Sequence, residues 1–320
     1  MTGLAGRRIA ALAVSAATVA VVWAPASSGR PAQLRPTSYP VGLRVIRFVD
    51  TSRSIVFKHR REPRTLLTQV RYPAALGPPS ATDVPNAPAA SADGPFPLIV
   101  FGHGFKEGPT RYARLLQAWA HAGYVVAAPL FPGENPAAPG GPNENDIVNE
   151  PADMSFVISR MLALGAGSGP LSGLIDPSLI AAAGQSDGAE VALAVAVDPR
   201  YRDPRVRAAI ILSGAEGPTG KFTFAPDSPP VLAAQGTADP INLPRVTYHW
   251  FRKARRPKYL LRLLGATHLP PYTEPGPDLE IVERTTLAFL GAYLKDNSLA
   301  LARLQADGDV PGVASLQADP

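Results

Sequence analysis

Residues 179–197 read LIAAAGQSDGAEVALAVAV, and this stretch decides the fold class. The apolar run that ends at Ala183 is typical of a short buried strand, and the Ala- and Val-rich run from Ala189 predicts a helix. Between them, Gly184 to Gly188 has the pattern G-x-S-x-G, which places Ser186 on a sharp strand-to-helix turn. Because glycines on either side avoid a Cβ clash, the stretch predicts a serine hydroxyl that points off the end of a sheet.

The same alternation of short apolar strands and helices continues along the chain in both directions. We expect strands at 41–49, 66–72, 98–101, 124–128, 179–183, 208–212, 231–235 and 259–264, and helices at 111–122, 151–164, 189–197 and 279–294. Short apolar strands joined by helices form a sheet that is covered on both faces. We therefore predict an α/β fold with a mostly parallel central sheet and helices on both faces. Residues 73–97, rich in Pro, Ala and Ser, are expected to form a long exposed loop.

The N-terminus has the composition of an export signal. Arg7 and Arg8 precede a mostly apolar run, and Ala24-Pro25-Ala26 offers a small-residue cleavage site. The apolar run is shorter than the roughly 20 residues that a membrane span needs. We expect a signal peptide over 1–26, no stable membrane span after cleavage, and a secreted or cell-envelope location. An uncleaved anchor is the alternative, and the paired arginines leave the twin-arginine export route open.

The rest of the chain reads as one catalytic domain. We expect a Pro/Ser-rich linker over 27–39, the domain over 40–300 and a loose C-terminal tail over 301–320. The net charge is +5 without a run of Lys or Arg, which argues against a nucleic-acid partner. The chain has no cysteine, so disulfides, thiolate metal sites and a cysteine nucleophile are excluded.

A serine hydroxyl becomes a good nucleophile only when a base takes its proton. His268 follows the expected strand 259–264 and is our candidate base, and Asp239 follows the strand 231–235 and is our candidate for the carboxylate that orients it. Glu216 is the rival for that carboxylate. His103 comes before the serine and belongs to a different motif. The remaining histidines are expected to lie on the surface or to pack structurally: His59, His121 and His249.

The reaction also needs donors for the oxyanion that forms at the carbonyl. Gly102-His103-Gly104-Phe105 follows the strand 98–101, where a first donor is expected. We predict that the backbone N–H groups of Phe105 and Asp187 form the oxyanion hole. His103 is expected to shape this turn, not to transfer protons.

Together these motifs resemble the α/β-hydrolases over about residues 41–294. The chain order serine, acid, histidine is the order of that family. The combination is most similar to secreted serine esterases near dienelactone hydrolase, chlorophyllase and platelet-activating-factor acetylhydrolase. Val70-Arg71-Tyr72-Pro73, before the Pro-rich loop, resembles the acetylhydrolase side of this group. The layout is also similar to bacterial cutinases and polyester hydrolases.

Two departures limit what the resemblance implies about substrates. Dienelactone hydrolases have a cysteine nucleophile, which this chain lacks, so lactone specificity does not carry over. Cutinase-like enzymes have a His and an apolar residue on either side of the serine, where this chain has Gln185 and Asp187. Polyester cleavage therefore does not carry over either.

The sequence predicts an ester hydrolase that needs neither a metal nor an organic cofactor. The stretch between Leu212 and Val231 is too short for a large lid, so we expect an open cleft for small-molecule or lipid-like esters with short to medium acyl chains. Ile241 and Trp250 are candidates for its walls. The alternatives are an acyltransferase, thioesterase or peptidase with the same three residues, and a non-catalytic binding protein with the same fold.

Overall fold

The computed structural model describes residues 1–3, 38–77, 82–215 and 223–320. Residues 36–320 form one compact unit, and residues 1–35 are a separate unit. The predicted signal peptide after its third residue and most of the predicted linker therefore lie outside the described residues. Within the described ranges, no helix is long and apolar enough to cross a membrane.

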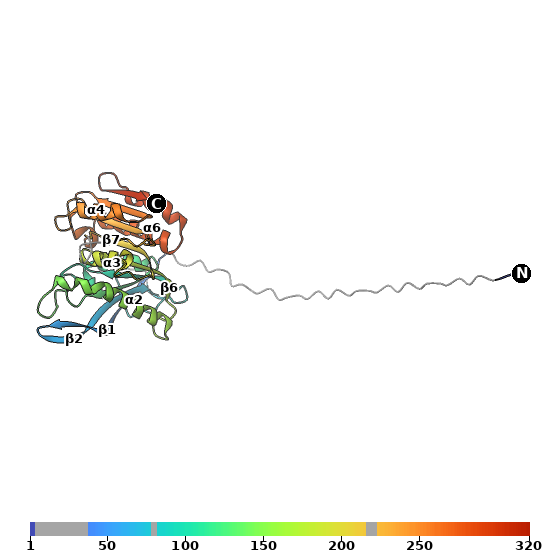
Figure 1. Ribbon diagram of the computed structural model, residues 1–320, viewed down its shortest axis with the longest axis horizontal. Helices are drawn as coiled ribbons and strands as arrows, with labels where there is room; N and C mark the ends of the chain where they lie inside the picture. The colour runs from blue at the N-terminus through green and yellow to red at the C-terminus, as the bar shows by residue number, and fades with distance from the viewer. Residues whose placement is uncertain (4–37, 78–81, 216–222) are drawn as a thin grey trace. The chain divides into compact units, whose positions relative to one another are not determined.

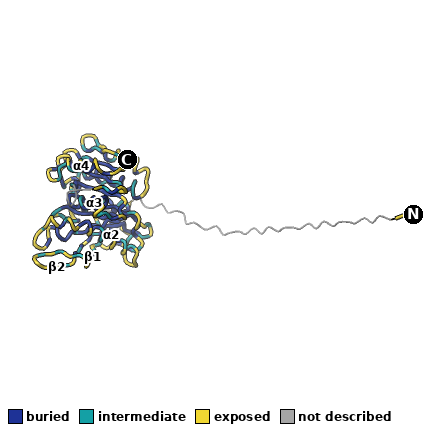
Figure 2. The backbone as a smooth tube through the Cα atoms, in the orientation of Figure 1, coloured by how far each residue is buried: buried dark blue, intermediate teal, exposed yellow. Residues whose placement is uncertain are grey.

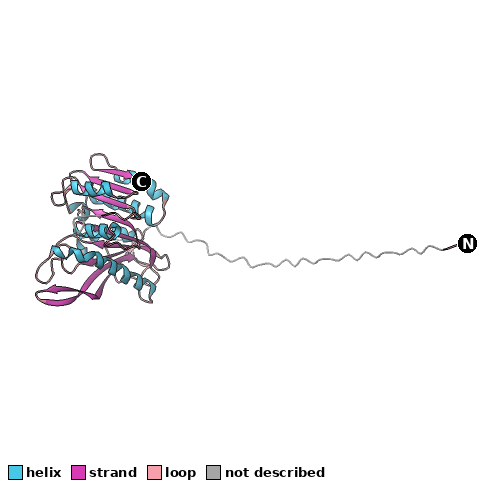
Figure 3. Ribbon diagram, viewed as in Figure 1, coloured by secondary structure: helices cyan, strands magenta, loops and turns pink. Residues whose placement is uncertain are grey.

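The described strands form one mixed sheet of ten strands, coloured magenta in Figure 3. Their order across the sheet is β10-β9-β8-β7-β6-β4-β5-β2-β1-β3. The strands from β4 to β9 run parallel, whereas β2 pairs antiparallel with both β1 and β5, and β10 pairs antiparallel with β9. Their bounds are β1 Val41–Phe57, β2 Arg60–Pro73, β3 Val84–Pro85, β4 Phe96–Gly102, β5 Val125–Leu130, β6 Ile175–Gln185, β7 Val206–Leu212, β8 Val231–Gly236, β9 Lys258–Leu263 and β10 Ala314–Asp319.

Helices cover both faces of this sheet, as predicted. Their bounds are η1 Pro109–Tyr112, α1 Ala113–His121, η2 Glu144–Asn149, α2 Glu150–Ala166, α3 Asp187–Val197, α4 Pro244–Lys253, α5 Pro270–Thr273, α6 Pro277–Leu294 and α7 Ser298–Gly308. Apolar side chains of α2, α3 and α4 belong to one hydrophobic core, and those of α1, α6 and α7 belong to the other. Figure 1 labels α2, α3, α4 and α6, and Figure 2 shows the buried residues of the interior in dark blue.

The two cores follow from strand geometry, because successive side chains of a strand point to opposite faces. In β4, Leu98 and Val100 belong to the core under α2 and α3, while Ile99 and Phe101 belong to the core under α1 and α6. All four side chains have no exposed area. A strand that is buried on both faces reads as a continuous apolar run, which is why β4 was predictable from its sequence.

The chain changes direction across the sheet at β4. From β4 it continues through α1 to β5 on one side, and then returns through α2 to β6 on the other side. The loops that leave the carboxyl ends of β4 and β6 therefore diverge, and such a switch point is where open α/β sheets bind their ligands. Gly102 at the end of β4 pairs with Gly184 near the end of β6.

The long hairpin of β1 and β2, blue at the lower left of Figure 1, is attached to the body by a buried arginine. Arg64 is 1% exposed, and its guanidinium donates to Asp146 Oδ1 at 2.9 Å and Oδ2 at 2.8 Å. The same guanidinium donates to Asp153 Oδ1 at 2.8 Å. A buried charge needs such partners, since an unpaired one is very costly.

The C-terminal segment corrects one prediction. Residues 301–320, expected to be a loose tail, contain most of α7 and the whole of β10, which extends the sheet beyond β9. Leu304 is 1% exposed and Leu316 is 6% exposed. The segment is ordered because these leucines complete the core beside α6 and the backbone of β10 pairs with the edge of β9.

The Pro-rich stretch 73–97 also differs from the exposed loop that we expected. Ala74 pairs with Ala89 in an isolated bridge, and the short strand β3 pairs with β1. Ala87 and Ala90 are each only 3% exposed. Small alanine side chains fit closely against the sheet edge, so this connection is partly packed within the residues that the structure describes.

Candidate active site

The predicted site residues come from the carboxyl ends of four parallel strands. The oxyanion turn follows β4, Ser186 follows β6, Asp239 follows β8 and His268 follows β9. These strand ends share one edge of the sheet, so residues far apart in sequence meet there. Ser186 is fixed to the next strand through its backbone N–H, which donates to Leu212 O at 3.0 Å.

Ser186 lies on the tight turn that its sequence pattern predicts. Its backbone has φ 55° and ψ −125°, and α3 begins at the very next residue. A non-glycine residue with positive φ is strained and persists only where its surroundings enforce it. A Cβ at Gly184 would lie 2.1 Å from Gly188 O, so only glycine permits the strand and the helix to approach this closely.

The structure brings Ser186, His268 and Asp239 into one hydrogen-bonded chain. His268 Nε2 lies 2.9 Å from Ser186 Oγ, and His268 Nδ1 lies 2.8 Å from Asp239 Oδ2. Ser186 is 7% exposed, His268 is 9% exposed and Asp239 is 2% exposed. Since a carboxylate only accepts, Nδ1 carries the imidazole proton and Nε2 is left as the acceptor that faces the serine.

Asp239 is held as a carboxylate by its neighbours. Its Oδ1 accepts the backbone N–H groups of Ile241 at 2.9 Å and Asn242 at 3.0 Å, and Gln235 Nε2 donates to Oδ2 at 3.2 Å. Burial on its own would raise the pKa of Asp239, but these hydrogen bonds and the one with His268 hold its pKa below the usual value. The side chain is therefore ionised and fixed in orientation.

The turn after β4 is built around a neutral histidine. His103 has no exposed area, its Nε2 accepts Phe131 N–H at 2.9 Å and its Nδ1 lies 2.9 Å from Gly104 O. Because Phe131 donates to Nε2, the ring proton is on Nδ1 and is donated to Gly104 O. Burial lowers the pKa of His103 to about 4, so the ring stays neutral near neutral pH.

The same turn lies directly against the nucleophile. A Cβ on Gly104 would lie 3.0 Å from Ser186 Cβ and 2.9 Å from Gln185 Oε1. Phe105 is half-buried at the next position, and the backbone N–H of Lys106 donates to Glu134 O at 2.9 Å. The turn that we predicted to carry an oxyanion donor is thus fixed beside Ser186, although the roles of Phe105 and Asp187 as donors stay predictions.

A buried polar chain that sequence reasoning missed links this turn to His268. Gly104 N–H donates to Tyr112 Oη at 3.2 Å, and Tyr112 Oη donates to Gln185 Oε1 at 2.7 Å. Gln185 Nε2 donates to His268 O at 3.1 Å and lies 3.3 Å from His268 Nε2. The only sequence signal was Gln185 itself, next to the candidate nucleophile.

A group of buried and partly buried carboxyl side chains, also missed from sequence, lies around Asp187, the residue after Ser186. We call Glu134, Glu150, Asp187 and Glu190 the acidic cluster. In the described residues, neither carboxylate oxygen of Glu134 or Glu150 has a hydrogen-bond partner. Burial, with the neighbouring carboxylates, raises the pKa of Glu134 to about 9, of Glu190 to about 8 and of Asp187 to about 6, and it raises the pKa of Glu150 well above its usual value.

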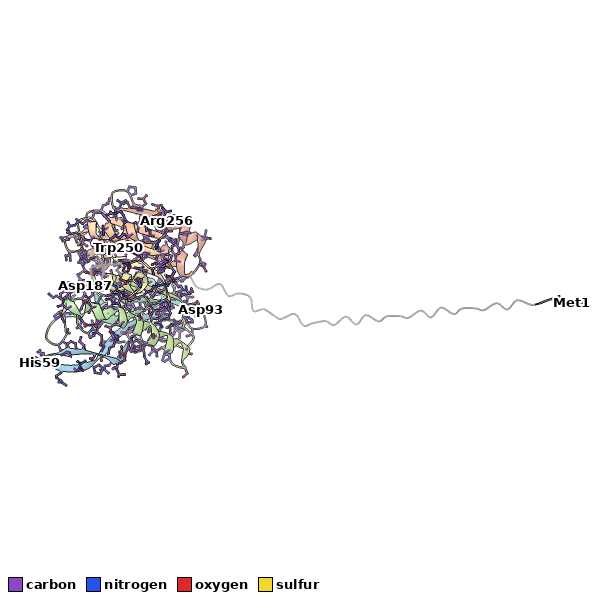
Figure 4. All side chains as sticks on the ribbon, in the orientation of Figure 1. Met1, His59, Asp93, Asp187, Trp250 and Arg256 are labelled. Carbon is purple, nitrogen blue, oxygen red and sulfur yellow. The ribbon has the colours of Figure 1, made fainter. Side chains whose placement is uncertain are left out.

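These carboxyls do not form a metal site. Within the described ranges, no three His, Cys, Asp or Glu side chains are arranged to hold a metal ion. With pKa values raised to about 9 and about 8, Glu134 and Glu190 are largely protonated and neutral at neutral pH. Figure 4 labels Asp187, the member that follows Ser186 at the start of α3.

The two predicted cleft residues have different environments. Ile241 is 67% exposed, beside Asp239, and its contact with a substrate stays a prediction. Trp250, labelled in Figure 4, is 1% exposed and its Nε1–H donates to Gly214 O at 3.1 Å. The expectation that Trp250 walls a cleft was wrong, because α4 turns this side chain and Phe251 into the core.

The other expected bystanders lie away from the hydrogen-bonded chain of Ser186. His59 is exposed at the tip of the β1–β2 hairpin, as Figure 4 shows, and His249 is exposed on α4. His121 Nδ1 lies 2.6 Å from Tyr39 O. The rival carboxylate, Glu216, lies outside the described residues.

A comparison with solved structures finds the same fold in a ferulic acid esterase from Streptomyces cinnamoneus. The two chains are 23% identical and superpose with a TM-score of 0.62 over 88% of this chain and 95% of the esterase. No protein-family model and no curated protein matches the sequence. At this level of identity the likeness shows the fold alone, and it confirms the predicted α/β class with a mostly parallel sheet and helices on both faces.

Proposed function

We propose that this protein is a serine hydrolase that cleaves carboxylic esters. The observation that carries the proposal is the continuous chain from Ser186 Oγ through His268 to Asp239, with contacts of 2.9 Å and 2.8 Å. A hydroxyl, an imidazole and a buried carboxylate in this sequence are the arrangement that activates a serine for acyl transfer. The fold shared with an esterase agrees with this reading.

Acylation begins when Ser186 Oγ attacks the ester carbonyl and its proton passes to His268 Nε2. Asp239 stabilises the imidazolium that forms, because its Oδ2 accepts the Nδ1 proton. The carbonyl oxygen becomes an oxyanion, which the N–H groups of Phe105 and Asp187 bind. As the tetrahedral intermediate collapses, the C–O bond to the alcohol breaks and the alcohol leaves with the proton from His268.

Deacylation repeats the sequence with water. Water gives a proton to His268 Nε2 as its oxygen attacks the acyl-enzyme, and the second intermediate releases the acid and returns the proton to Ser186. Every proton is carried by His268 in this scheme, so the reaction draws on side chains and backbone groups of the chain itself. His103 takes no part in proton transfer, since its two ring nitrogens are engaged with Gly104 and Phe131.

The proposed substrates are small-molecule or lipid-like esters with short to medium acyl chains. The exposed side chain of Ile241 beside Asp239 and the half-buried Phe105 beside the nucleophile offer apolar surface to an acyl group. Within this proposal, the motifs resemble those of dienelactone hydrolase, chlorophyllase and platelet-activating-factor acetylhydrolase. We also propose export through the N-terminal signal, and hence a secreted or cell-envelope location.

The proposal is tested with the full chain and its Ser186→Ala variant on p-nitrophenyl acetate, butyrate, octanoate and palmitate. We expect hydrolysis by the wild-type protein, none by the variant, and faster cleavage of butyrate than of palmitate. A fluorophosphonate should label the wild type at Ser186. If the folded wild type neither hydrolyses these esters nor reacts with the probe, the hydrolase proposal is wrong and a binding protein with this fold is favoured.

The same assay separates hydrolysis from transfer to another acceptor. With a primary alcohol added at high concentration, an acyltransferase forms the new ester at the expense of the free acid. A hydrolase releases mainly the acid, so the product ratio tells the two activities apart. Amide and thioester substrates distinguish a peptidase and a thioesterase in the same way.

A further inference from the structure

Gln185, the residue before the nucleophile, joins the two parts of the site that must act together. We propose that Gln185, together with Tyr112, is a positioning residue. It fixes the position of the base His268 relative to the oxyanion turn at Gly104, on either side of Ser186. This inference rests on the proposed hydrolase function, since it assigns a role within that reaction. Gln185 is 1% exposed and is the last residue of β6.

The hydrogen-bond directions fix the orientation of the Gln185 amide. The carbonyl oxygen of His268 can only accept, so the group that faces it at 3.1 Å must be the amide nitrogen. The amide oxygen then faces Tyr112 Oη at 2.7 Å and accepts its single proton. Tyr112 Oη in turn accepts Gly104 N–H at 3.2 Å, so each of the three contacts has one donor and one acceptor.

This hydrogen-bonded chain is buried, so its polar groups have no water to replace a lost partner. Tyr112 has no exposed area, and its ring packs on Phe101 of β4 with 4.9 Å between ring centroids. Polar groups in such an environment cost free energy if they lose their partners, because water cannot replace them. The Gln185 amide therefore has one low-energy position, and the segments attached to both of its ends are fixed with it.

The two ends of the chain are the groups whose placement controls acyl transfer. The His268 end holds the loop that carries the base, and the amide nitrogen also lies 3.3 Å from Nε2, the ring atom that receives the serine proton. The Gly104 end holds the turn that precedes the predicted donor at Phe105. A displacement of about 1 Å in either group can cost on the order of 100-fold in rate.

The side chain of Gln185 is not placed to touch the reacting carbonyl in this scheme, so its effect is on the transition state and not on substrate affinity. We expect Gln185→Met, which keeps the length of the side chain without its polar atoms, to lower kcat by about 10- to 100-fold with little change in KM. Tyr112→Phe, which removes only the linking hydroxyl, should lower kcat in the same range.

The experiment measures kcat and KM on p-nitrophenyl butyrate for Gln185→Met, Tyr112→Phe and the double variant. Tyr259→Phe is the matched control, because it removes another buried hydroxyl, which bonds to Tyr293 Oη at 2.6 Å on a different part of the sheet. Thermal unfolding of each variant shows how much stability was lost. If the two residues act as one chain, the loss of kcat in the double variant is no greater than the larger of the two single losses.

Three outcomes overturn the proposal. The first is an unchanged kcat in Gln185→Met, and the second is a loss no greater than that of Tyr259→Phe at equal thermal stability. The third is a double variant whose loss is the product of the two single losses, which means that the residues act separately. Failure of the proposed function looks different: the wild type itself then neither hydrolyses esters nor reacts with a fluorophosphonate, and the positioning role is overturned with it.

Discussion

Glu134→Gln tests whether the acidic cluster makes folding depend on pH. Burial raises the pKa of Glu134 from 4.5 to about 9. Between those values the folded protein keeps a proton that the unfolded chain has released, so the free energy of unfolding falls as the pH rises. Below this window the folded and unfolded forms are both protonated, so the free energy of unfolding no longer depends on pH through this group. Glutamine is neutral throughout, so the variant lacks this loss.

The size of the effect follows from the number of protons. One proton held only by the folded state changes the free energy of unfolding by about 1.4 kcal/mol per pH unit. The stability of Glu134→Gln relative to wild type should therefore improve by roughly 3 kcal/mol between pH 6 and pH 8. The carboxyl at position 134 has no exposed area, so solvent screening does not reduce this figure appreciably.

The assay is equilibrium unfolding in urea at pH 6, 7 and 8, followed by tryptophan fluorescence. Trp119 and Trp250 are at most 1% exposed, so their emission reports loss of the two cores. Glu280→Gln, at an exposed position of α6, is the control and should show no such trend. If the difference between Glu134→Gln and wild type is the same at pH 6 and pH 8, the carboxyl is not protonated in the folded protein and the reasoning fails.

Three further predictions concern the site and the frame that supports it. Asp239→Asn should lower kcat roughly 10⁴-fold because it favours the wrong tautomer of His268, and ester hydrolysis with an unchanged thermal unfolding curve checks this. Arg64→Met should cost about 3–5 kcal/mol, because Asp146 loses the buried guanidinium that neutralises it and Asp153 keeps only Arg53 as a cationic partner. Arg60→Met, at an exposed position, should change the urea unfolding free energy by less than about 0.5 kcal/mol. A chain that lacks residues 298–320 should be about 4–6 kcal/mol less stable, since two buried leucines and the pairing of β9 are lost; an unchanged urea midpoint would contradict this.

The three residues of the proposed triad could be found from sequence because each lies just after a strand with a clear signal. β6 and β8 are apolar runs without exposed side chains at their carboxyl ends, and their alternation with helices dictates that those ends meet. The turn at Ser186 adds the local G-x-S-x-G pattern, which is typical of a serine nucleophile on a strand-to-helix turn. The distances within the triad, in contrast, depend on the register of four strands and required the structure.

Contacts between distant, individually ordinary residues could not be predicted. Tyr112 lies in a single turn of 3-10 helix, and nothing near it in sequence indicates that its hydroxyl reaches Gln185, 73 positions away. Trp250 was misread because an aromatic residue near a candidate site suits a cleft and a core equally well. Its position on the inner face of α4 decided the question. The strand β10 was missed because three of its six residues are polar and it pairs with only one neighbour.

The strained turn at Ser186 has a consequence for how activity responds to heat. A serine at φ 55° is held there by β6 before it and α3 after it, at an intrinsic cost on the order of 1–3 kcal/mol. The folded domain therefore positions the hydroxyl before any ester binds and holds the backbone at Ser186 in its strained conformation. Warming that loosens the contact between β6 and α3 releases this strain while most helices and strands persist. Thermal inactivation should thus begin as a local event at this turn, ahead of global unfolding.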